Sequence, residues 1–154
     1  MTLDPTTLEQ IAATTLAHYQ QSAEGFREGT RDHDVSQNID ALLRHLQGAA
    51  PFTILDFGCG PGRDLQAFTR LGHVAIGLDG TERFTQMARE DSGCEVWHQD
   101  FLKLDLQAER FDGIFANAQS AQNRHHHPLP LIQIAELGAG VIQQRVIAGM
   151  KAGL

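Results

Sequence analysis

The feature that most restricts the fold is a run of apolar residues that leads directly into a glycine-rich turn. Residues 52–57 are nearly all apolar, as expected for a parallel strand covered on both faces, and the turn follows without a spacer. Its three glycines, Gly58, Gly60 and Gly62, let the backbone turn tightly and approach a ligand where any Cβ would collide. The alternative is a plain strand-to-helix turn that needs glycine only for positive φ angles.

Strands and helices alternate through the central part of the chain. The patterns predict further strands at 73–78, 95–98 and 111–117, and helices at 64–71 and 82–91. Because strands that alternate with helices form right-handed crossovers, this order predicts an α/β fold: a Rossmann-like parallel sheet with flanking helices.

Two more helices are expected before the first strand. Apolar residues at helical spacing predict one over 6–22, capped by Thr6 or Thr7, and another that is capped by Ser36 and ends near Gly48. The polar stretch 26–35 between them, rich in turn formers, predicts a loop.

The motif Ile54–Gly62, with Asp56 near the end of the strand, resembles the cofactor motif of class I methyltransferases. The resemblance implies S-adenosylmethionine (SAM) as cofactor and S-adenosylhomocysteine (SAH) as product. It implies that Asp56 takes the amino group of the methionine moiety, and that Gly58, Cys59 and Gly60 also bind the cofactor. A nicotinamide-binding fold is the rival, but its fingerprint would need a third glycine where Arg63 stands.

The ends of the later strands carry the other residues that the resemblance places at the cofactor. Asp79, followed by Gly80, would accept hydrogen bonds from the ribose hydroxyls; alternatively it caps the next helix. Asp100 would meet the adenine amino group and Phe101 would pack on the ring, unless Asp100 is an ordinary loop residue. Asn117 stands at the end of the fourth strand, where the acceptor meets the sulfonium in similar methyltransferases.

Two residues near the amino terminus complete the predicted site. In similar methyltransferases this segment forms a lid over the methionine tail, so Arg31 would pair with the SAM carboxylate and Tyr19 would be half core, half ligand. The alternative for both is a solvated loop beside a packed helix. No catalytic residue is predicted, because the sulfonium is already an activated donor and a general base is optional.

The resemblance covers about residues 10–118, and the composition then changes. Residues 119–154 contain one acid, Glu136, and no aromatic residue. We expect residues 1–118 to form the SAM-binding region, and residues 119–154 an atypical, partly helical tail without the later strands of the family's seven-stranded sheet. The tail is a truncated or out-of-frame end, an element that pairs chains, or a natural short form. The three histidines at 125–127 are not expected to form a metal site, because consecutive side chains cannot all face one ion.

Charge and composition narrow the class of function. The net charge of −7 and the absence of a basic run argue against a nucleic-acid partner and favour a small-molecule methyl acceptor. No secretion signal or apolar membrane span is apparent, so we expect a cytoplasmic protein without a membrane partner. An exposed sheet edge would favour homo-oligomers. The alternative to an enzyme is a non-catalytic remnant that binds SAM or forms oligomers.

Overall fold

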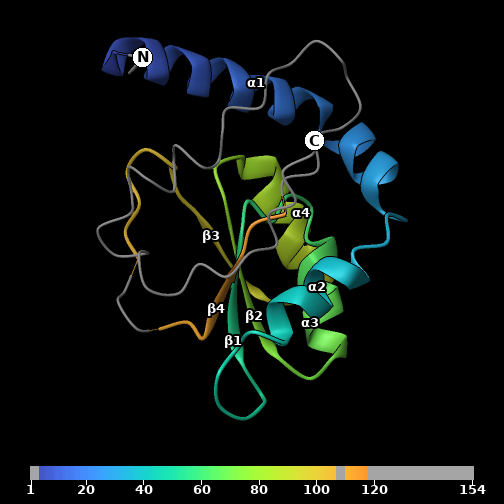
Figure 1. Cartoon of the computed structure of the whole chain (residues 1–154). Coiled ribbons are helices and arrows are strands. Elements are labelled where there is room, and N and C mark those ends of the chain that lie inside the picture. The colour runs from blue at the N-terminus through green and yellow to red at the C-terminus, as the bar shows by residue number, and fades with distance from the viewer. Residues whose placement is uncertain (1–3, 107–109, 118–154) are drawn as a thin grey trace.

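The computed structural model describes residues 4–106 and 110–117 (Figure 1). These residues form four helices and four strands, in the order α1 (Pro5–Thr30), α2 (Ser36–Leu43), β1 (Thr53–Phe57), α3 (Arg63–Arg70), β2 (Val74–Asp79), α4 (Glu82–Ser92), β3 (Glu95–His98) and β4 (Gly113–Phe115).

The strands form a parallel sheet in the order β3-β2-β1-β4. Strand β1 lies between β2 and β4, and its Asp56 is level with Gly77 on one side and Phe115 on the other. Because all four strands run the same way, their carboxyl ends meet at one edge, which Figure 1 shows beside α1. The predicted α/β class, a Rossmann-like parallel sheet with flanking helices, is confirmed.

Alternation along β1 divides the core between the two faces of the sheet. Ile54 packs with apolar residues of α2 and α3, which lie with α4 on one face (Figure 1). Leu55 and Phe57 point to the other face, where Phe101 and Phe111, from the segment after β3, pack against them. Asp56 therefore points to the face that α2 and α3 cover, at the edge where the site is built.

The predicted strands and central helices agree with the structure to within one or two residues at most ends. The prediction for the amino-terminal helix was wrong at both ends. Asp4 caps it, with its carboxylate 3.0 Å from the Thr7 amide, in place of Thr6 or Thr7. The helix also continues to Thr30, through residues that we expected to form a loop.

Packing against α4 explains the longer helix. Ala23 is buried and Phe26 lies with its ring centroid 5.1 Å from that of Phe84 on α4. Each glycine in a helix costs about 1 kcal/mol relative to alanine, so Gly25 and Gly29 argue against a helix when only the local sequence is considered. Burial of the apolar face outweighs that cost.

The second helix begins and ends differently from the prediction. Val35 rather than Ser36 occupies the N-cap position, and Asp34 accepts a hydrogen bond from the Ser36 amide at 2.9 Å. The helix ends at Leu43, several residues before Gly48. The expectations for residues 119–154, the three histidines included, lie outside the described residues. In residues 4–106 and 110–117, no helix is long and apolar enough to cross a membrane.

Candidate cofactor site

The glycine turn joins β1 to α3 at the carboxyl edge of the sheet. The φ angles of Gly58, Gly60 and Gly62 are +75°, +53° and +95°. Residues other than glycine rarely adopt this region. The amides of Gly58 and Cys59 both donate to the Leu78 carbonyl, which ties the start of the turn to β2. Among the residues that the structure describes, none lies within 4 Å of a Cβ built on Gly58. The turn therefore faces open space at this point.

Asp79 holds the turn in place from the end of β2. Its carboxylate accepts hydrogen bonds from the Gly60 amide at 2.9 Å and from the Thr81 amide at 2.8 Å, and the residue is 6% exposed. Burial raises the pKa of Asp79, and the hydrogen bonds from Thr81 and Gly60 oppose that rise. Thr81, not Asp79, occupies the N-cap position of α4. The link to Gly60 is a structural role that the sequence alone did not suggest.

Asp56, near the end of β1 and just before the turn, is almost completely buried, at 1% exposure. Its Oδ2 atom has no hydrogen-bond partner in the structure. Burial raises the pKa of Asp56 well above its usual value, and the negative charges of Asp64 and Asp79 raise it further, while Arg63 opposes the rise. A buried acceptor without a donor is costly, and a ligand that brings a donor or a positive charge would remove that cost.

Arg63, the residue that argued against a nicotinamide fingerprint, joins two helices, α1 and α3, near this carboxylate. Its guanidinium lies 2.7 Å from Asp64 Oδ1 and donates to the Thr30 carbonyl, at the end of α1, at 2.8 Å. Charge-assisted contacts of this kind are strong where solvent is excluded. Arg63 therefore anchors the carboxyl end of α1 to the start of α3, a role that sequence reasoning missed.

One face of α1 covers the site. A Cβ on Gly60 would lie 3.7 Å from the Phe26 ring, and one on Gly80 would lie 3.0 Å from Leu16 Cδ2. Tyr19 lies between these contacts; burial raises its pKa, and the negative charge of Asp79 raises it further. Leu16, Tyr19 and Phe26 are separated by three and seven residues, so they share a helix face. The helix thus lies over both the glycine turn and the end of β2.

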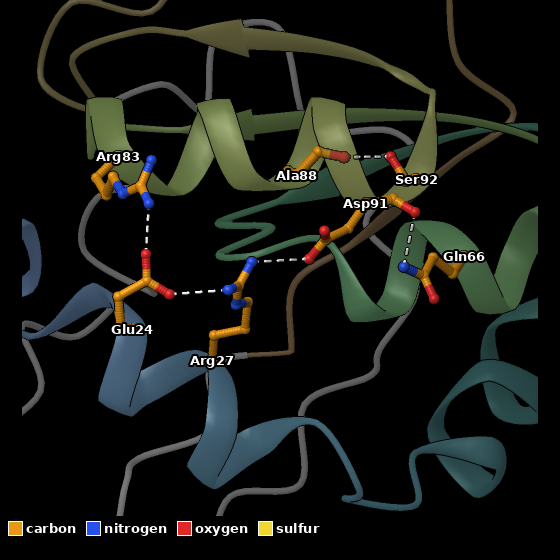
Figure 2. Close-up of polar contacts among 7 residues, drawn as sticks. All are labelled: Glu24, Arg27, Gln66, Arg83, Ala88, Asp91 and Ser92. Atoms are coloured by element: carbon orange, nitrogen blue, oxygen red, sulfur yellow. Dashed lines mark hydrogen bonds and ion pairs between the residues drawn. The ribbon is translucent and has the colours of Figure 1, made fainter.

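Polar contacts hold α1 against α4 beside this covered region (Figure 2). Glu24 pairs with both Arg83 and Arg27, and Arg27 also lies 3.4 Å from Asp91. Positive and negative charges therefore alternate along a series of ion pairs that joins the two helices. The Gln20 side chain accepts a hydrogen bond from the Arg83 amide at 3.1 Å, which caps α4 where Thr81 makes no side-chain cap. We call Gln20, Glu24, Arg27, Arg83 and Asp91 the α1–α4 polar network.

Glu24→Gln is expected to make the docking of α1 less sensitive to salt. These side chains are partly exposed, so added salt screens them and each pair contributes little. Thermal unfolding should show a small loss of stability at low salt that disappears at high salt. Glu28→Gln removes an exposed charge from the same helix and is the control. Identical salt dependence in the two variants would contradict a role for the network.

The structure brings some of the other predicted residues to the site. Phe101 lies against Gly80, with its ring 3.3 Å from a Cβ built there, and its centroid is 5.0 Å from that of Phe57. Asp100 is exposed and accepts a hydrogen bond from the Leu102 amide at 2.9 Å. The Cys59 side chain is buried in the core, where burial raises the pKa of the thiol, so a ligand would meet only its backbone.

Arg31 and Asn117 differ sharply in their surroundings. The Arg31 side chain is 73% exposed and lies 3.8 Å from Asp32. Asn117 is partly buried just beyond β4, and its Oδ1 accepts a hydrogen bond from Asn38 of α2 at 3.0 Å. Asn38 was not predicted; its place in a helix that packs on β4 could not be read from local sequence. Among the described residues, no group of three or more His, Cys, Asp or Glu could hold a metal ion.

A parallel sheet with a glycine turn after its first strand and buried carboxylates at the ends of its first two strands defines a Rossmann-like methyltransferase domain. The family model described as "Methyltransferase domain" matches residues 54–136, more than half of the chain. The chain belongs to this family. The match continues past residue 118, where the resemblance read from the sequence ended.

Relatives and solved structures agree with this family. The chain is 29% identical over 103 residues to a sterol 24-C-methyltransferase of Debaryomyces hansenii. The aligned region covers 62% of this chain and 26% of that protein. It therefore spans about a quarter of the curated relative that it matches.

Two examples illustrate the solved structures that share the fold. One is a TehB-like SAM-dependent methyltransferase from Corynebacterium glutamicum, with TM-score 0.59, 20% identity, and coverage of 86% of this chain and 68% of that one. The other is phosphoethanolamine N-methyltransferase 1 of Haemonchus contortus in complex with phosphoethanolamine and SAH, with TM-score 0.57, 16% identity, and coverage of 74% and 26%.

Proposed function

We propose that the protein binds SAM at the carboxyl edge of its sheet and transfers the methyl group to a small-molecule acceptor. The glycine turn carries this proposal: no described residue lies within 4 Å of a Cβ built on Gly58, and buried carboxylates, Asp56 and Asp79, stand near the ends of the two strands that the turn adjoins. Membership of the methyltransferase family and the SAH bound to the Haemonchus structure support the choice of cofactor.

Each part of the cofactor has a residue suited to it. The buried Asp56 carboxylate would accept a hydrogen bond from the ammonium of the methionine moiety. Asp79 would accept hydrogen bonds from the ribose hydroxyls with its remaining lone pairs. Phe101, beside Gly80, would pack on the adenine ring. The covering face of α1, with Tyr19, would act as the lid that excludes water.

The chemistry needs positioning more than proton transfer. Bound SAM would supply an activated methyl group, which the acceptor's nucleophilic atom attacks as the carbon–sulfur bond breaks and SAH leaves. Orientation of the two reactants is worth up to about 7–11 kcal/mol of the barrier. The net charge of −7 favours an acceptor other than nucleic acid, because phosphate binding relies on clustered Lys and Arg.

Gly58→Ala tests the cofactor site by calorimetric titration with SAM and SAH. Since no described residue occupies the space next to Gly58, an added Cβ would meet the ligand and is expected to lower affinity at least about tenfold, or about 1.4 kcal/mol. Gly72→Ala is the matched control, because Gly72 also has a positive φ (+87°) and no described residue within 4 Å of an added Cβ, but lies away from the site. Equal affinities in the two variants would contradict the proposal.

The titration of the unaltered protein separates the two classes of function. Binding of SAM without methylation of any acceptor in a panel of amines, phenols and thiols would favour the non-catalytic alternative. No binding of either SAM or SAH would overturn the proposed function as a whole.

A further inference from the structure

Two buried side-chain polar atoms at the carboxyl edge of the sheet have no hydrogen-bond partner. Across residues 4–106 and 110–117 these are Asp56 Oδ2, an acceptor, and Asn117 Nδ2, a donor. Unpartnered buried polar atoms are rare in folded proteins and each costs about 1–3 kcal/mol. Two of opposite polarity at one edge indicate a ligand group that carries both a donor and an acceptor.

The two atoms lie near the ends of neighbouring strands, Asp56 in β1 and Asn117 just beyond β4. Asp56 pairs in register with Phe115, and Asn117 follows two residues later in the chain. Asn117 contacts Asn38 of α2, and α2 covers the same face to which Asp56 points. Both side chains therefore lie near the carboxyl edge of the sheet, on the face that α2 covers.

Asn38 determines which end of the Asn117 amide is left without a partner. Its Nδ2 donates to Asn117 Oδ1 at 3.0 Å, so the Asn117 oxygen is occupied and its NH₂ group remains available. Asn38 also lies in the first turn of α2, the positive end of a helix, which favours a negative group over a positive one nearby. The available donor is therefore suited to an anionic oxygen.

Two arginines, Arg31 and Arg63, could also bind an anionic oxygen, but both make other contacts in the structure. Arg31, which the sequence suggested as the partner of the cofactor carboxylate, is exposed and lies beside Asp32. Arg63 is bound to Asp64 and to the Thr30 carbonyl.

We infer that Asn117 binds the carboxylate of the cofactor's methionine moiety, and that Asn38 is a positioning residue that keeps the Asn117 NH₂ group turned toward it. The inference rests on the proposed function. An α-amino acid carries its ammonium and carboxylate on one carbon, which matches the acceptor of Asp56 and the donor of Asn117. The amide pair thereby recognises the amino-acid end of SAM from the β4 side of the site.

The test compares SAH with its analogue that lacks the carboxylate, 5′-(3-aminopropylthio)-5′-deoxyadenosine, by calorimetric titration. The unaltered protein should prefer SAH by about tenfold or more, as expected for a hydrogen bond to a charged group. In Asn38→Asp, the Asn117 amide should rotate to donate to the new carboxylate and turn its oxygen toward the ligand. The preference for SAH should then disappear, although Asn117 itself is unchanged.

Asn117→Asp should have the same effect, because it replaces the donor with an acceptor of the same shape. Asp40→Asn alters an exposed side chain on the same helix and should keep the preference. The ratio of the two affinities separates positioning from a structural role, because a loss of folding would weaken both ligands alike. Circular dichroism and thermal unfolding confirm that each variant is folded.

The outcomes distinguish this inference from the proposed function. SAH binding with no preference over the analogue, or a preference that survives in both Asn38→Asp and Asn117→Asp, would overturn the inference and leave the cofactor site standing. Stronger binding of the decarboxylated analogue would mean that Asn117 presents its oxygen, which also overturns it. If the unaltered protein binds neither ligand, both proposals fail.

Discussion

Asp56→Asn is expected to make the free protein more stable, and the gain should increase with pH. Burial raises the pKa of Asp56, so the folded chain holds this proton more tightly than the unfolded chain does. The contribution to stability is fully present below the unfolded pKa of about 3.8 and is lost as pH rises through the folded pKa. Asparagine does not ionise, so the variant avoids that loss.

The same substitution should weaken SAH binding about a hundredfold, because the ammonium of the ligand would lose its negative partner in a buried site. Thermal unfolding between about pH 5 and 8 measures the stability, and titration measures the affinity. Asp105→Asn, which removes an exposed carboxylate, is the control and should change neither. A variant that is less stable at high pH, or that keeps its affinity, would show that Asp56 is a structural residue.

Gly62→Ala should strongly destabilise the fold. Gly62 has a φ of +95°, and a Cβ there would lie 2.8 Å from the Ala88 Cα and 3.0 Å from its Cβ, both in the middle of α4. Backbone atoms of a packed helix cannot move aside cheaply, so strain and overlap together should cost about 3 kcal/mol. The melting temperature should fall by roughly 10 °C.

Gly72→Ala separates the cost of steric overlap with α4 from the cost of backbone strain at a positive φ. Its φ of +87° imposes similar strain, but no residue in 4–106 or 110–117 lies within 4 Å of the added Cβ, so the loss should be about 1 kcal/mol. Equal losses in the two variants would mean that the turn does not depend on close packing between Gly62 and α4. Thermal unfolding of both variants alongside the unaltered chain is the measurement.

The strands and the central helices could be predicted because their signals are local. A continuous apolar run predicts a parallel strand covered on both faces, and β1 and β2 follow that rule closely. The glycine turn could also be predicted, because only glycine tolerates the positive φ angles of Gly58, Gly60 and Gly62. The Rossmann-like class follows from the order of these elements.

The extent of α1 could not be predicted, since what decides it lies far away in the sequence. Gly25 and Gly29 weaken the helix locally, whereas Phe26 and Arg27 gain contacts with α4 more than fifty residues later. Interactions at such separations leave no pattern in a short window.

The site divides in the same way. Local sequence is enough to predict which carboxylates stand near the ends of the first two strands and where the glycines must be, because strand period and backbone geometry act between neighbouring residues. The contacts of Asp79 with the Gly60 amide and of Asn38 with Asn117 depend on the folded arrangement of the chain. These partners are brought together by the packing of separate elements, and it is that packing which excludes water and leaves Asp56 buried without a partner.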